Sequence, residues 1–262
     1  METTQEASIV REVSQNLTSN ELTPTETLTS EEDSACDESS SYLTAKIKPY
    51  WRGRLHRVAF YAALCMYAVL LFFMKNTNKI YLTIYFASQI ILYGVSSTYH
   101  LTAWTSKQKE AFFRKLDHSS IFLLISGTQT CVAMAIKETC GPHAASAMTY
   151  VPLTYVIGGL GILKVFFLTT LPRYVNVLYY VLHGASAALF FPMKCFVEES
   201  VIGILCILGG AAYILGGAVY GAKKPDPWPE TFGYHEVFHL LTIIGNLFFL
   251  LTVVWASYKG SA

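Results

Sequence analysis

The sequence has few charged residues for its length, and this scarcity limits the class of protein it can encode. Of its 262 residues only 14% are Asp, Glu, Lys or Arg, whereas 53% are hydrophobic. A soluble domain averages about 25% charged residues. The composition therefore favours a protein embedded in a lipid bilayer over a soluble one.

Several chemical signatures are also missing. The six cysteines form no Cys-x-x-Cys pair, there is no glycine-rich phosphate loop, and no basic-aromatic face indicates nucleic acid binding. The start of the chain lacks the basic and apolar regions of a secretory signal, so none is expected. Cys140 and Cys195 fall on the same expected side of the membrane; a disulfide is one alternative, but we predict two separate thiols.

Residues 1–45 differ from the rest of the chain. They contain ten acidic residues and one basic residue, a net charge of −9, whereas the remainder carries +10. They are rich in Ser, Thr and Glu and show no helical or strand period. Because too little apolar surface is present to offset the entropy of ordering, we predict a disordered acidic tail ahead of a membrane domain at 46–258.

The membrane domain is a series of apolar runs, each near the 20 residues that a helix needs to cross a hydrocarbon core of about 30 Å. Backbone groups in lipid must bond within their own segment, so the fold class is an all-α, seven-transmembrane helix bundle. Glycines at 158–161, 209–210 and 216–221 predict close helix contacts. The expected spans are 58–74, 80–99, 119–136, 146–168, 174–193, 201–221 and 236–256.

The distribution of Lys and Arg predicts the orientation. Thirteen of them fall in the segments on the N-terminal side of the membrane and five on the other side. Because basic residues accumulate on the cytoplasmic side, we expect a cytosolic N-terminus and an extracytoplasmic C-terminus. The sequence leaves open which membrane the chain occupies.

The clearest chemical motif is His235-Glu236-Val237-Phe238-His239, where the last apolar run begins. Residues i and i+4 share a helix face, so His235 and His239 point the same way. His-Glu-x-x-His is also the signature of many soluble zinc hydrolases, in which the glutamate is the general base. A pair of histidines at the membrane interface is the alternative without a metal.

Further polar residues are expected at the same cytoplasmic end. His100 ends the second span, and Asp117 opens the third. No His, Cys, Asp or Glu follows His239, so a third ligand has to come from upstream, and His100 is the best candidate. Three histidines would leave a metal position open for water, with Asp117 as the proton handler and Ser96, one turn before His100, as a hydrogen-bond donor.

Three other ionisable residues fit less well. We expect His183, in the middle of the fifth span, to be a core histidine with its hydrogen bonds satisfied. His118 faces about 100° away from Asp117 on a helix, which makes it an interfacial residue. Glu236 lies on another helix face than the two histidines, so Asp117 is preferred over it as the base.

Together these motifs resemble the hemolysin III / progestin and adipoQ receptor (PAQR) family. The resemblance rests on Ser96-x-x-x-His100, on the stretch from Asp117-His118 to Gly127-Thr128, and on Pro225 through Phe232-Gly-x-His235-Glu-x-Phe-His239. It covers about residues 46–258. The chain departs from many members at Gln129-Thr130-Cys131 and at Phe249.

The resemblance implies seven helices with a cytosolic N-terminus, and zinc held by His100, His235 and His239, with Ser96 and Asp117 around a zinc-bound water. Adiponectin receptors of this family are linked to ceramide hydrolysis, and bacterial relatives carry the hemolysin name. Three functions remain open for the chain: a PAQR-type receptor that hydrolyses a ceramide-like lipid amide, a receptor with purely structural zinc, and a membrane-perturbing protein. The expected partners are the bilayer and a ceramide, sphingolipid or fatty acid, or an extracellular ligand.

Overall fold

The computed structural model describes residues 48–73, 76–168 and 171–259. The predicted acidic tail lies outside these residues. The described part is all-helical, as expected, and six of its helices are long and apolar enough to cross a membrane. They are α3 (Arg54–Phe73), α4 (Asn76–Leu101), α5 (Lys107–Cys140), α6 (Ala145–Phe167), α9 (Ser200–Ala222) and α10 (Tyr234–Lys259).

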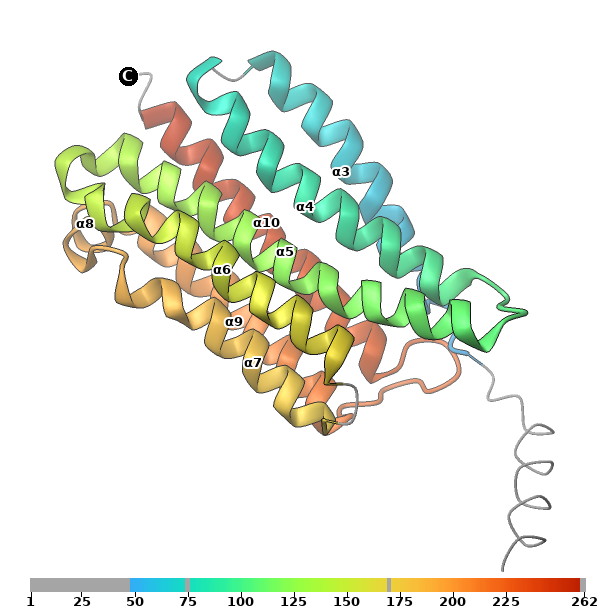
Figure 1. The fold of residues 1–262 in the computed structure, drawn as a ribbon. Coiled ribbons are helices and arrows are strands. Elements are labelled where there is room, and N and C mark those ends of the chain that lie inside the picture. The colour runs from blue at the N-terminus through green and yellow to red at the C-terminus, as the bar shows by residue number, and fades with distance from the viewer. Residues whose placement is uncertain (1–47, 74–75, 169–170, 260–262) are drawn as a thin grey trace, which may run out of the picture. The chain divides into compact units, whose positions relative to one another are not determined.

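The long helices lie side by side, and α5 runs through the middle of the bundle (Figure 1). It packs against α4 and α6, and also against α10 and α7. Its central part is buried almost continuously from Ser119 to Ile136. Two of the hydroxyls there bond to their own helix: Ser120 donates to the Asp117 carbonyl and Thr130 to the Ser126 carbonyl. Hydrogen bonds within the bundle thus satisfy part of this polar helix, whereas the hydroxyls of Ser119 and Thr128 are buried without a partner in the described part of the chain.

Glycines let the helices approach closely, as predicted. A Cβ built on Gly245 of α10 would lie 2.6 Å from the Tyr213 ring of α9, and one on Gly209 would lie 2.8 Å from Phe249. The rule does not hold at every glycine, because Gly159 and Gly210 have open space around their Cβ positions. Close approach at a glycine also occurs between α6 and α5, where a Cβ on Gly161 would lie 2.3 Å from the Phe122 ring.

The fifth expected span, 174–193, differs from the prediction. The helix there, α7 (Arg173–Ser186), has 14 residues and is followed by the short 3₁₀ helix η2 (Ala187–Leu189) and by α8 (Met193–Glu198). Fourteen residues extend only about 21 Å, less than a hydrocarbon core of about 30 Å. The end of α7 is stabilised from outside, because the Gln129 amide donates to the carbonyl oxygens of His183 and Gly184, each at 3.0 Å.

The prediction that Cys140 and Cys195 are separate thiols was wrong. They form a disulfide that joins the end of α5 to α8, with their Cα atoms 5.8 Å apart. This separation lies within the usual range for a disulfide, about 4.4–6.8 Å. The helical span breaks after α7, and α8 then lies against the end of α5, so the two cysteines can pair. The hydropathy pattern does not show this break.

Candidate metal centre

The candidate metal centre is a triad of histidines at one end of the bundle, which we call the histidine end. Here α4 ends, and α5 and α10 begin. His100 comes from the last turn of α4, and His235 and His239 come from the first turns of α10. One ring nitrogen from each lies within 4.8 Å of those of the other two. The expectation that these three residues meet agrees with the structure.

The local sequence explains why α10 presents both of its histidines here. Asp226 accepts a hydrogen bond from the Tyr234 N–H at 2.8 Å, and Glu236 accepts one from the Gly233 N–H at 2.9 Å. A glutamate that reaches back to the start of its own helix resembles half of a capping box. These bonds set the first residue of α10, and hence the direction in which His235 and His239 point.

The donor atoms of the triad fit a metal ion. The Nε2 atoms of His100 and His235 are 3.1 Å apart, and the Nδ1 atom of His239 is buried without a hydrogen-bond partner. Two imidazole nitrogens bound to one zinc ion at about 2.0–2.1 Å lie about 3.3 Å apart in a tetrahedral arrangement. His100 and His239 are 9% and 2% exposed, so few water molecules compete for their nitrogens. The three residues could bind a metal.

Asp117 and Ser96, which the sequence also placed in the site, lie beside the triad. An Asp117 carboxylate oxygen is 3.9 Å from the Nε2 atom of His100. Ser96 is buried and lies in the turn of α4 before His100. Both side chains line the same cavity as the three histidines. A carboxylate, a hydroxyl and three imidazoles are thus gathered from α4, α5 and α10.

Glu236 faces away from the cavity, as its place in the helix predicted. Its side chain is completely buried, forms an ion pair with Arg52 and accepts the Gly233 N–H. Both carboxylate oxygens therefore have partners, and these contacts connect α10 to the segment before α3. This occupation argues against Glu236 as a general base.

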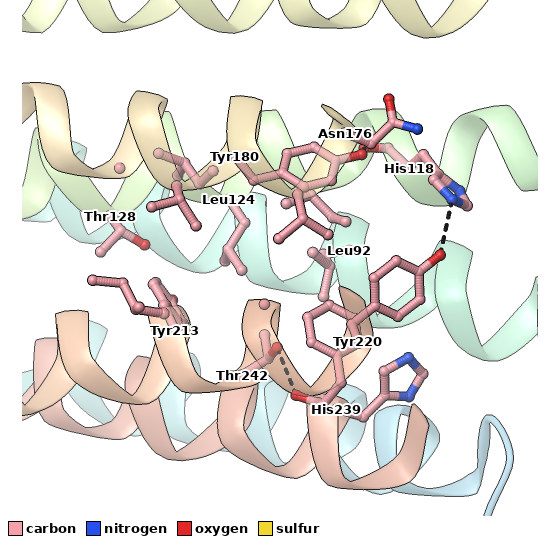
Figure 2. Close-up of a pocket in the computed structure, with 18 of the residues that line it drawn as sticks. Leu92, His118, Leu124, Thr128, Asn176, Tyr180, Tyr213, Tyr220, His239 and Thr242 are labelled. Atoms are coloured by element: carbon pink, nitrogen blue, oxygen red, sulfur yellow. Dashed lines mark hydrogen bonds between the residues drawn. The ribbon is translucent and has the colours of Figure 1, made fainter. Parts of the chain in front are cut away.

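Two further histidines that the sequence analysis considered, His118 and His183, lie outside the triad. His183 is a buried core residue, as expected, and its Nε2 atom is 3.0 Å from the Thr154 hydroxyl. Its Nδ1 atom is buried without a hydrogen-bond partner among the described residues, so the expectation that its hydrogen bonds are satisfied was wrong for that nitrogen. His118 is partly exposed at the histidine end, with its Nε2 atom 3.5 Å from the Tyr220 hydroxyl (Figure 2). Neither ring joins the triad.

The sequence did not single out His56. Its ring lies parallel to that of His239, with centroids 3.7 Å apart and 11° between the planes. Both of its nitrogens are buried without a hydrogen-bond partner. The signal that could have found it is a histidine opening the first apolar run at the same end as the others.

A cavity of about 880 Å³ extends from the triad into the bundle. The residues labelled in Figure 2 show its two walls, with Leu124 and Tyr180 facing Tyr213 and Thr242, and with His239, Tyr220 and His118 at one end. Its lining on α9 follows one helix face, Gly203, Cys206, Gly210, Tyr213 and Gly217. Pockets for small molecules have about 300–1,000 Å³, so the cavity is large enough for a lipid chain.

The fold and the site together define a class: a multi-pass helical membrane protein with a candidate metal centre at one end of its bundle and a long cavity beside it. Residues 44–250 match the Haemolysin-III related family. The chain belongs to this family, which confirms the resemblance seen in its motifs.

Proposed function

We propose that the chain is a PAQR-type membrane receptor that binds one zinc ion through His100, His235 and His239 and hydrolyses a ceramide-like lipid amide. The observation that carries the proposal is the position of the histidine triad at the end of the cavity, beside Asp117. A purely structural metal site would not require a cavity of about 880 Å³ next to it.

The chemistry assigned to the residues follows from their types and places. Zinc held by three imidazoles supplies Lewis acidity to the amide carbonyl. Asp117 accepts a proton from the attacking water and returns it to the departing amine. Ser96, which lines the cavity together with Asp117, is assigned the role of a hydrogen-bond donor in the site. The acyl chain occupies the part of the cavity between α5, α7 and α9, where apolar side chains exclude water from the reaction.

The proposed orientation places the histidine end and the N-terminus in the cytosol, since the basic residues accumulate there. The lipid then enters from the bilayer, and α7 contributes the seventh helix despite its length. A receptor with structural zinc is the second candidate, favoured by the burial of two of the three histidines, which a catalytic site does not require. In the part of the chain that the structure describes, no particular feature favours a membrane-perturbing role.

Metal content is the first test. Purified wild-type protein is expected to contain about one zinc per chain, and a His235→Ala/His239→Ala variant to have lost it. Hydrolysis of ceramide is then measured for wild type and for Asp117→Asn, which replaces the carboxylate at constant size. Zinc binding and folding are expected to persist in Asp117→Asn, whereas turnover falls at least a hundredfold.

Each outcome supports or excludes one of the candidate functions or roles. Negligible metal in both proteins removes the zinc site. Zinc without turnover in the wild type selects the receptor with structural zinc. Turnover that is unchanged in Asp117→Asn removes the role of Asp117, and release of dye from liposomes would select the membrane-perturbing role.

A further inference from the structure

The part of the cavity at the histidine end has an excess of positive charge. Only two of its lining carboxylates, Glu110 and Asp117, face five basic side chains. One of the five, Arg52, is already paired with Glu236. The other four are Lys48, Arg114, Lys115 and Arg173. None of these four forms an ion pair with a carboxylate among the residues described.

Arg173 and His235 both lie near the ring of Tyr220. The Arg173 guanidinium is 4.8 Å from the centre of the Tyr220 ring, and that ring is 5.7 Å from the His235 ring. The hydrogen bonds of the guanidinium are long, 3.4 Å to the Tyr220 carbonyl and 3.5 Å to the Tyr234 hydroxyl. The Tyr220 ring thus contacts both the guanidinium and His235, and the groups that hold the guanidinium are neutral and leave its charge uncompensated.

Two lysines at the same end have similar surroundings. The Lys115 ammonium donates to the Phe166 carbonyl at 3.2 Å, and that of Lys48 lies 3.5 Å from the His100 carbonyl. A backbone carbonyl accepts a hydrogen bond but carries no net charge to neutralise an ammonium. A ligand with a negative group would gain charge-assisted hydrogen bonds from these side chains, which are about twice as strong as neutral ones.

We propose that the lipid bound in this cavity carries an anionic, phosphate-type headgroup, which Arg173, Lys115 and Lys48 bind beside the histidine triad. The proposal rests on the proposed function, in that it names the substrate class of the same site. The acyl chain extends into the apolar cavity, the amide lies at the triad, and the phosphate faces the basic side chains. Arginine suits a phosphate because its planar donors match two of the phosphate oxygens.

The experiment compares a ceramide with its 1-phosphate, which share the amide and the acyl chain. Equilibrium binding of each is measured to the full chain in micelles of a neutral detergent. The test variant is Arg173→Gln/Lys115→Gln. The control is Arg57→Gln/Lys224→Gln, which also removes one Arg and one Lys charge, from exposed residues that do not line the cavity.

Wild type and control are expected to bind the phosphate lipid roughly tenfold or more tightly than the neutral one. The test variant is expected to lose this preference, and Arg173→Lys/Lys115→Arg to restore it because the charges return. Equal affinity of the wild type for both lipids would overturn the proposal. An equal loss in test and control variants would also overturn it, because the effect would then be one of overall charge.

Two further arms complete the test. If Arg173→Gln/Lys115→Gln fails to fold, Lys48→Gln is used instead, because it removes one charge from an exposed residue. An unchanged preference of Lys48→Gln for the phosphate lipid counts against the site. Inorganic phosphate as competitor distinguishes a soluble anion from a lipid headgroup: competition as strong as that of the phosphate lipid would assign the site to free phosphate. Turnover is measured separately from binding. A preference for the phosphate lipid without hydrolysis would reject only the proposed function. Hydrolysis without this preference would reject only the present inference.

Discussion

His56 of α3 and His239 of α10 stack face to face, with ring centroids 3.7 Å apart. His56 also packs against Tyr93, whose hydroxyl accepts a hydrogen bond from the Asn246 amide at 2.6 Å. The stack therefore connects the candidate ligand His239 to a ring and hydrogen-bond network in the middle of the bundle. A ring held on one face by such packing has little freedom to rotate away from a metal.

The first prediction concerns this stack. His56→Ala is expected to weaken metal binding about 10–100-fold, as is usual when a group that orients a ligand is removed. His56→Phe keeps a flat ring and is expected to stay within a few fold of wild type. The measurement is zinc retention against a competing chelator. Equal weakening in both variants would show that the His56 nitrogens, and not the stacking, support the site.

The second prediction concerns the buried pair of Arg52 and Glu236. Arg52→Gln leaves a completely buried carboxylate without its cation, and we expect a loss of about 3–5 kcal/mol in the free energy of unfolding. Arg52→Gln/Glu236→Gln is expected to recover part of this loss, because no unpaired charge remains. Denaturant unfolding in detergent measures both variants, and a double variant less stable than Arg52→Gln would contradict the explanation.

The third prediction concerns the contact between α9 and α10. Gly245→Ala places a methyl group 2.6 Å from the Tyr213 ring and 3.1 Å from the Gly209 carbonyl, so we expect it to cost about 1–3 kcal/mol. Gly159→Ala is the matched control, because its Cβ meets open space and alanine favours a helix by about 1 kcal/mol. Thermal midpoints are compared; similar shifts in both variants would show that the α9–α10 approach can relax.

The fourth prediction concerns the disulfide. Denatured protein is expected to expose two more reactive thiols after reduction than before, as counted by alkylation and mass measurement. Cys140→Ala/Cys195→Ala removes the link between α5 and α8, and we expect a cost of about 2–5 kcal/mol. Cys65→Ala, at an exposed free thiol, is the control. An unchanged thiol count after reduction would show that the two cysteines are separate in the isolated protein.

The sequence alone predicted the helical class and six of the spans, because a run of about 20 apolar residues has few structures open to it in lipid. The same reasoning predicted that His100, His235 and His239 meet, since alternating helices bring every second helix end to one side. The i, i+4 spacing of His235 and His239 also predicted that both lie on the same face of their helix. These features depend on local pattern and on the order of the helices.

Tertiary structure alone decided the remainder. The end of α7 depends on the Gln129 amide from another helix, so hydropathy predicted too long a span. The Cys140–Cys195 disulfide needs the turn that follows this break. The stack of His56 on His239 joins residues 183 positions apart, and the pairing of Arg52 with Glu236 is similar. Such contacts depend on which helices are neighbours and how they are rotated, and packing of the whole bundle sets both.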